Sequence, residues 1–392
     1  MATQSVLVVV ILTLILVKTT HSIRSYRRLS HIPGPPLAGI SRLWLLKSTL
    51  GSRNYLNLFE ANLKYGPLAR VGPNRLVTSD PELWRRVNAP RSPYRRSPWF
   101  GAFSFKPGVN NVFSEQREEQ HDELRKKLAA GYAGKENPGM ENEIDERIRD
   151  LISLIERKYV STDEEPGRQM DFGQIAQFFT LDVISGLAFG QPFGDLIVDE
   201  DKFDYIKTNE EAFPVIVSMS ELREVRSFLE KSSLMKLLAP SAKDKIGFGK
   251  VIGLAKDIVA ERFGDDKKTK QDMLGSFVSH GLGQEEAASE AMLQLVAGSD
   301  TTATAVRAIT LFLITTPRVL WRLRKEIDEA VDNGSISTPI QDSEARELPY
   351  LKACIKEGLR MFPPAPGDFP MVVPPEGDTF NGVFLPGGTE IG

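Results

Sequence analysis

The sequence predicts a mainly helical protein with small β-sheets, an α+β fold. Residues 115–334 are helical in pattern, with apolar stripes at helical spacing. Near the N-terminus, Leu68–Thr78 contains two short strand signals around the turn Gly72-Pro73-Asn74, and near the C-terminus Asn381-Gly382 separates two more. This pattern predicts a helical body with a small sheet built near each end of the chain.

The N-terminus predicts a membrane anchor. Val6–Val17 is almost entirely apolar, and its basic flank follows it, at Lys18, Arg24, Arg27 and Arg28. Positive charge stays on the cytoplasmic side, so we expect residues 1–22 to span a membrane once, with the body facing the cytoplasm. A signal peptide or a buried core helix are the alternatives.

A stiff connector follows the anchor. Pro33-Gly34-Pro35-Pro36 contains three residues with fixed backbone angles, so residues 23–36 are interpreted as a basic flank and a Pro-rich hinge. The main domain then covers residues 37–392. Within it, Asp80 is a predicted N-cap before Pro81, a residue favoured at the first position of a helix.

The longer predicted helices each carry an apolar stripe that repeats every three to four residues. They are Glu115–Ala130, Met140–Tyr159, Phe172–Leu187, Phe248–Phe263, Gln284–Thr315, Pro317–Val331 and Leu348–Phe362.

Composition excludes several classes of function. The chain of 392 residues has 41% hydrophobic residues and a formal charge of −3, so it has a sizeable core and no excess of positive charge for binding nucleic acid. A single cysteine forms no internal disulfide, and four scattered histidines do not predict a zinc site.

The middle of the Gln284–Thr315 helix has an unusual composition, Ala297-Gly298-Ser299-Asp300-Thr301-Thr302. Gly costs about 1 kcal/mol relative to Ala in a helix, and Thr hydroxyls bond back to the carbonyl four residues earlier. An acid beside a hydroxyl is suited to relaying protons to a small ligand. The alternative is a buried helix whose small residues allow close packing.

A second motif lies on the helix Leu348–Phe362. Glu357 and Arg360 are spaced for an ion pair, and the apolar side chains of this helix predict that it is partly buried. An ordinary surface pair is the alternative. Cys354 lies on the same helix and is interpreted as a small buried hydrophobic residue.

Taken together, these segments resemble the cytochrome P-450 family of haem-thiolate monooxygenases over nearly the whole chain. Ala297–Thr302 is similar to the family's oxygen-binding helix, and Glu357-x-x-Arg360 to its Glu-x-x-Arg helix. The anchor and hinge resemble those of endoplasmic-reticulum members. The runs Asn110–Phe113 and Tyr132–Lys135 resemble fungal oxidases of secondary metabolism.

The resemblance implies a role for each motif residue. Asp300 and Thr301 are the expected catalytic pair, delivering protons during dioxygen activation, and Thr302 is a weaker candidate. We expect His121 and Arg125 to hold the haem propionates, unless their helix is an ordinary charged surface, and Ala297 and Gly298 to contact the cofactor. Glu357 and Arg360 are expected to be structural. The segments expected to line the substrate pocket are Pro93–Val112, Phe213–Val225 and Pro364–Val373.

The sequence departs from the family at two points. The family's cysteine loop, Phe-x-x-Gly-x-x-x-Cys-x-Gly, which supplies the axial thiolate, is not found among residues 1–392, and Cys354 precedes the Glu-x-x-Arg motif. We therefore expect a cytochrome P-450 fold that lacks its C-terminal haem-ligand segment, with the axial cysteine beyond Gly392. Met371 stands where a propionate-binding Arg is expected.

The expected function is haem-dependent monooxygenation of a small apolar secondary metabolite at a fungal endoplasmic-reticulum membrane. Electrons are expected from NADPH through a reductase. Two alternatives remain: an inactive, truncated remnant without the axial cysteine, and a membrane-tethered binding protein that is not an enzyme.

Overall fold

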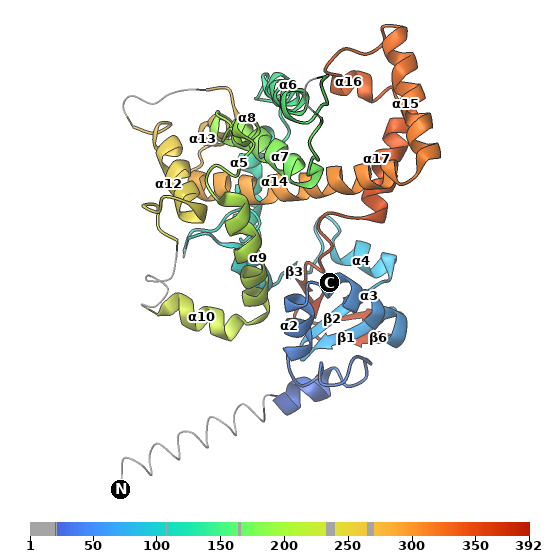
Figure 1. The fold of residues 1–392 in the computed structure, drawn as a ribbon. Coiled ribbons are helices and arrows are strands. Elements are labelled where there is room, and N and C mark those ends of the chain that lie inside the picture. The colour runs from blue at the N-terminus through green and yellow to red at the C-terminus, as the bar shows by residue number, and fades with distance from the viewer. Residues whose placement is uncertain (1–19, 21, 107, 164–165, 233–239, 265–269) are drawn as a thin grey trace.

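The computed structural model describes residues 20, 22–106, 108–163, 166–232, 240–264 and 270–392. Most of these residues are helical, and short strands form small sheets, as the sequence predicts (Figure 1). The predicted anchor, residues 1–22, lies almost wholly outside the described residues. Among the described residues, Phe172–Phe189 is the one helix that is long and apolar enough to cross a membrane, and 67% of it is buried inside the protein. The number of candidate spans rises to two if the bent pair Gln284–Ile314 and Pro317–Asp332 is counted as one span.

The helices of the body begin and end close to the predicted positions. Asp80 caps α4 as expected, because its carboxylate accepts hydrogen bonds from the backbone N–H groups of Glu82 and Leu83. The described helices are α2 Leu43–Leu50, α3 Asn54–Tyr65, α4 Pro81–Val87, η1 Pro98–Phe103, α5 Glu118–Tyr132, α6 Met140–Lys158, α7 Phe172–Phe189, α8 Asp195–Val198, α9 Tyr205–Glu221, α10 Arg223–Lys231, α12 Gly247–Ala260, α13 Met273–Ser279, α14 Gln284–Ile314, α15 Pro317–Asp332, α16 Asp342–Ala345 and α17 Pro349–Met361.

Helix α14 is the central element of the helical part. It runs through the middle of the body and contacts α7, α12, α13, α15 and α17 (Figure 1). Two glycines allow this close packing. A Cβ on Gly298 would lie 2.9 Å from Ile184 of α7, and a Cβ on Gly358 of α17 would lie 2.4 Å from Ile309 of α14.

The larger sheet joins the two ends of the described chain. Its strands are β1 Leu68–Gly72, β2 Arg75–Thr78, β3 Arg95–Arg96, β4 Met371–Val372 and β7 Glu390–Ile391, in the order β1-β2-β7-β4-β3. Strand β7 pairs parallel with β2 and antiparallel with β4. The predicted hairpin forms a second sheet of β5 Asp378–Phe380 and β6 Val383–Leu385, and its turn residues Asn381 and Gly382 both have positive φ.

The Pro-rich connector packs on the body. Pro33 accepts a hydrogen bond from the backbone N–H of Arg70, and a Cβ on Gly34 would lie 1.9 Å from the Arg70 carbonyl oxygen. The buried Arg70 guanidinium donates to the carbonyls of Ser25 and Tyr26. The segment before the sheet is therefore fastened to β1 by hydrogen bonds.

A buried ionic cluster holds the larger sheet to the helices. We call Arg75, Glu221, Arg223, Asp368 and Glu390 the Arg75 cluster. Arg75 Nε donates to Asp368 Oδ2 at 2.9 Å and Nη1 donates to Glu390 Oε2 at 3.0 Å, while Nη2 lies 3.6 Å from Glu221 Oε1. Arg223 pairs with the other oxygen of Glu390. Burial opposes the charge of Arg75, but the three carboxylates outweigh it and raise the pKa of Arg75.

We expect Arg75→Met to destabilise the protein by about 3–5 kcal/mol, because it leaves buried carboxylates without their cation. Denaturant unfolding of the full chain measures this loss. Arg346→Met is the matched control, since the Arg346–Asp342 pair is exposed, and it should leave the unfolding midpoint nearly unchanged. Arg75→Lys keeps the charge but loses the bidentate fork, so an intermediate midpoint is expected. Equal midpoints for Arg75→Met and the control would contradict this account.

Candidate active site

The catalytic pair predicted from the sequence lies on an accessible side of α14. The helix runs unbroken through Ala297–Thr302, and the Thr301 hydroxyl donates to the Ala297 carbonyl at 2.8 Å, as the sequence predicts for Thr in a helix. Asp300 is exposed and Thr301 is half-buried, whereas the neighbouring Ser299 is fully buried. The acid and the hydroxyl therefore face away from the core.

The two other residues predicted on this segment face different surroundings. Ala297 is exposed on the same side as Thr301, one helical turn before it. Gly298 faces Ile184 of α7, where a side chain would clash. The structure thus gives Gly298 a packing role between α7 and α14.

The imidazole of His121, on α5, is largely buried and lies near a positive charge. The His121 side chain is 14% exposed, and its Nδ1 has no hydrogen-bond partner among the described residues, because the Asp122 carboxylate is 3.7 Å away. Burial lowers the pKa of His121, and the positive charge of Arg96 lowers it further. The structure therefore brings Arg96 close to His121.

Arg96 is a candidate site residue that the sequence analysis missed. Burial lowers its pKa to about 10, and its Nε has no hydrogen-bond partner among the described residues. The guanidinium lies 3.9 Å from the centre of the Phe100 ring and donates to the Phe113 carbonyl. Arg96 on β3 is directly opposite Met371 on β4. It therefore supplies a guanidinium beside the position where the expected Arg is replaced by Met371.

Arg125, the other residue predicted to bind a propionate, is exposed one turn after His121 on α5. No hydrogen bond or ion pair joins the Arg96–His121 group to Asp300 or Thr301 in the described ranges. The structure thus presents two separate groups. Asp300 and Thr301, the predicted catalytic pair, lie on α14, and a guanidinium and an imidazole lie on β3 and α5.

The Glu-x-x-Arg pair forms, and its helix is partly buried as predicted, but the pair itself lies on the exposed side. Arg360 Nε and Nη2 donate to the two oxygens of Glu357 at 2.8 and 2.7 Å, yet the side chains are 67% and 61% exposed. In α17 only Gly358 is fully buried, at the close approach to α14, and the first turn of the helix donates backbone hydrogen bonds to Glu326 of α15. The apolar residues Ile355 and Leu359 remain exposed.

Cys354 is half-buried on α17, as expected for a small side chain at a helix contact. Burial raises the pKa of its thiol, and the nearby Glu326 carboxylate adds to the rise. The thiolate form, which ligates metals, is therefore disfavoured at this position. This agrees with the interpretation of Cys354 as a hydrophobic residue.

The three segments expected to line a substrate pocket meet through aromatic rings. Trp99 packs on Phe103 at 4.9 Å and on Phe369 at 6.1 Å between ring centroids, and Phe103 lies 6.5 Å from Phe213. Phe113 packs on Phe103 and Phe369 as well. This aromatic cluster of Trp99, Phe103, Phe113, Phe213 and Phe369 offers an apolar surface built from each predicted segment.

The donors at Arg96 and His121 fit the acidic side chains of a haem group. Both carry buried nitrogen atoms without hydrogen-bond partners, and buried polar atoms of this kind are costly unless an acceptor satisfies them. A propionate is an acceptor that pairs well with a guanidinium. Cys354 does not fit the axial position, because it lies on α17 with a raised pKa.

Known proteins similar to this chain match it over most of its length. Residues 33–392 match the Cytochrome P450 family. Cytochrome P450 monooxygenase ABA1 of Pyricularia oryzae is 43% identical over 95% of this chain and 74% of its own length. The similarly named aba1 of Botryotinia fuckeliana is 39% identical over 93% and 72%, and abl1 of Leptosphaeria maculans is 35% identical over 99% and 68%.

We expect Arg96→Met to raise the pKa of His121, because a positive charge that disfavours the imidazolium is removed. An NMR titration of the four histidines measures the shift. Arg95→Met is the matched control, since this exposed neighbour on β3 points to the opposite face.

The same substitution should change the dependence of stability on pH. The folded pKa of His121 is lowered, so as the pH falls through about 6.5 the unfolded chain takes up the proton first and stability is lost. The Arg96→Met protein should lose less stability on acidification than the Arg95→Met protein. An unchanged His121 pKa in Arg96→Met would contradict the proximity of the two side chains.

Proposed function

The chain belongs to the cytochrome P450 family, and on that premise we propose that it is a haem-dependent monooxygenase acting on a small apolar molecule of fungal secondary metabolism. The observation that carries the proposal is the placement of Asp300 and Thr301 on the accessible side of the central helix α14. The family relatives support the reaction class.

The residues that would hold haem are Arg96 and His121, through its propionates, with Arg125 as a further cation on α5. When bound, haem supplies the activation of dioxygen and the transfer of one oxygen atom. The chain's own contribution is to bind this group, to orient the substrate and to move protons.

Thr301 is prepared to accept a hydrogen bond. Its own hydroxyl proton is committed to the Ala297 carbonyl, so the lone pairs of Oγ1 are left for a donor on the accessible side of α14. Asp300 is the next residue and is exposed to water. It can take protons from solvent and pass them through a water molecule towards Thr301.

The aromatic cluster supports an apolar substrate. Trp99, Phe103 and Phe369 come from different segments and present ring edges and faces to one another. Trp99 is buried and its indole N–H donates to Glu221 at 3.0 Å, so the exposed apolar area of the cluster comes mainly from Phe213 and Phe369. A flat or branched hydrocarbon skeleton suits such a surface.

We further propose that the protein is a single-pass protein of the endoplasmic-reticulum membrane, with its body in the cytoplasm, and that an NADPH-dependent reductase supplies its electrons. Family membership supports the reductase. Exposed apolar side chains support the membrane, because they gather on α2, α3 and α10, at the end of the molecule where the described chain begins (Figure 1). They are Leu43, Leu50, Phe59, Leu63, Val225 and Phe228.

An absorption spectrum distinguishes this proposal from the two haem-free alternatives. Protein expressed from its genomic locus should carry haem and give the thiolate-type band of the reduced, carbon-monoxide-bound form. Reading the nucleotide sequence after the Gly392 codon for the cysteine loop is the direct companion test. A protein that retains no haem would overturn the monooxygenase proposal and favour the inactive remnant or the tethered binding protein.

In haem-loaded protein, Asp300→Asn should slow product formation by about 100-fold or more, because proton delivery in general acid catalysis is worth 10²–10⁴. Thr301→Ala should instead lower the ratio of product formed to oxygen consumed. Asp328→Asn is the matched control, since this carboxylate is exposed on α15 and lies outside the Ala297–Thr302 segment. Oxygen consumption and product are measured together after haem content is equalised. Equal product rates for Asp300→Asn and Asp328→Asn would exclude a relay through Asp300.

A further inference from the structure

A carboxyl group is buried on α14 without a countercharge. Glu290 is fully buried and forms no ion pair with any described residue. Its Oε1 accepts a hydrogen bond from the backbone N–H of Val112 at 2.5 Å, and its Oε2 lies 3.5 Å from the hydroxyl oxygen of Tyr132 on α5. Glu290 precedes Thr301 by eleven positions, or about 16 Å along the helix axis, so it lies apart from the proposed proton relay.

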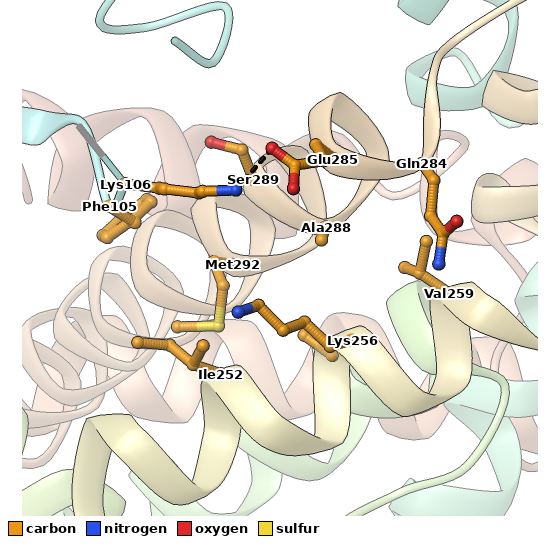
Figure 2. A pocket seen from close by; sticks show the side chains of 11 residues that line it. Phe105, Lys106, Ile252, Lys256, Val259, Gln284, Glu285, Ala288, Ser289 and Met292 are labelled. Carbon is orange, nitrogen blue, oxygen red and sulfur yellow. Dashed lines mark hydrogen bonds and ion pairs between the residues drawn. The ribbon is translucent and has the colours of Figure 1, made fainter. Parts of the chain in front are cut away.

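The lysines nearest to this part of α14 act on another carboxylate. Figure 2 shows the preceding turn of the helix, where Lys106 pairs with Glu285 and Lys256 extends from α12. Lys106 and, more weakly, Lys256 lower the pKa of Glu285. Neither lysine offsets the charge of Glu290, whose charged neighbour is Glu286 of its own helix. Like charges disfavour each other, so this neighbour also opposes ionisation of Glu290.

The other helices around Glu290 bring no cation to it. Near α13, His280 lies 3.6 Å from Glu136, and Asp182, the one titratable residue of α7, accepts hydrogen bonds from the backbone of residues 194–196. Burial therefore raises the pKa of Glu290 to about 7, although the hydrogen bonds to it oppose the rise. Below this pH Glu290 is a neutral acid, which offers one O–H donor and one carbonyl acceptor.

Val112 belongs to a turn that is held together by one buried amide. We call residues 111–114 the Asn111 turn. The Asn111 side chain is fully buried, accepts hydrogen bonds from two backbone N–H groups of the turn and donates to the Phe103 carbonyl. The turn is therefore rigid within itself, and a contact that holds Val112 also holds Phe113.

Two parts of the proposed active site depend on this turn. The Phe113 ring packs on two other rings of the aromatic cluster, and the Phe113 carbonyl accepts a hydrogen bond from Arg96. The buried hydrogen bond from Val112 to Glu290 joins the turn to α14. Over the described ranges, the only other hydrogen bond between this loop and α14 is the exposed pair drawn in Figure 2.

We propose that Glu290 is a positioning residue that, as a neutral acid, fastens the Asn111 turn to α14. Its carbonyl oxygen Oε1 accepts from Val112, and its acid proton on Oε2 is donated to the phenol oxygen of Tyr132. The turn then holds Phe113 in the substrate surface and the Phe113 carbonyl at Arg96. The consequence for substrate binding rests on the proposed function, whereas the hydrogen bond itself does not require haem.

Hydrogen–deuterium exchange of the Val112 amide in the full chain tests the contact. Glu290→Leu removes the acceptor, so exchange at Val112 should accelerate about tenfold, the effect of losing one hydrogen bond. Glu290→Gln keeps an acceptor and a donor and should leave the rate unchanged. Glu156→Leu is the matched control, since this glutamate is exposed on α6. Equal rates at Val112 in Glu290→Leu and the control would overturn the proposal.

The protonation state is tested by stability, in a variant that keeps the shape of the side chain. The folded pKa of Glu290, about 7, lies above the unfolded value of about 4.5, so its contribution is complete below the unfolded value and is lost as the pH rises to about 7. Glu290→Gln carries no titrating proton, so its denaturant midpoint should rise relative to that of the unsubstituted protein between about pH 5 and about pH 7.5. A constant difference over this range would overturn the neutral acid.

Kinetics of the haem-loaded protein test the consequence for the substrate. Glu290→Leu should raise KM severalfold with little change in kcat, because the turn carries a ring of the substrate surface, and Glu290→Gln should keep the KM of the unsubstituted protein. An unchanged KM in Glu290→Leu would overturn the role in substrate binding. An unsubstituted protein without turnover would contradict the proposed monooxygenase function instead, and the exchange and stability measurements would still decide the role of Glu290.

Discussion

The Arg75 cluster is the constraint on which the rest of the structure depends. One buried guanidinium is neutralised by carboxylates from the end of α9, from the loop after α17 and from β7. None of these charges is tolerable without the others in a buried site. The cluster therefore fixes β7 between β2 and β4 and holds α9 and α10 over the sheet. The aromatic cluster is held by the same contacts, since Glu221 also binds Trp99 and Asp368 directly precedes Phe369.

The central helix α14 is held in place by close packing at two glycine positions. Gly298 and Gly358 let α7 and α17 approach α14 from two directions, and larger residues would separate the helices. Because Gly298 faces α7, the accessible side of the same segment carries Ala297 and Thr301. The residues of this segment with low helix propensity thus lie on two faces of the helix. Gly298 packs against α7, and Thr301 lies on the accessible side.

The sequence predicted the features that depend on residues close together in the chain. Helix periodicity, the Asp80 cap and the Asn381-Gly382 turn depend on neighbours a few residues away, and the structure confirms them. It did not predict the pairing of Arg75 with Asp368, because the two are separated by 293 positions. Arg96 was missed for the same reason, since its importance comes from β3–β4 pairing and from His121 on another helix. The exposure of Ile355 and Leu359 on α17 was not predicted, because apolar periodicity does not say whether a partner covers the helix.

Charge balance separates the structural ion pairs from the sites. In the Arg75 cluster each buried cation meets carboxylates of the chain, so the group stabilises the fold and asks for no ligand. At Arg96 and His121 two buried nitrogen atoms lack acceptors, and neither carboxylate oxygen nor backbone carbonyl of the described residues satisfies them. Other buried arginine nitrogen atoms without a hydrogen-bond partner, such as those of Arg223 and Arg262, belong to guanidiniums that form ion pairs with carboxylates, whereas Arg96 forms no ion pair within the described residues. A carboxylate-bearing cofactor would therefore supply at Arg96 the countercharge that the chain itself supplies at Arg75.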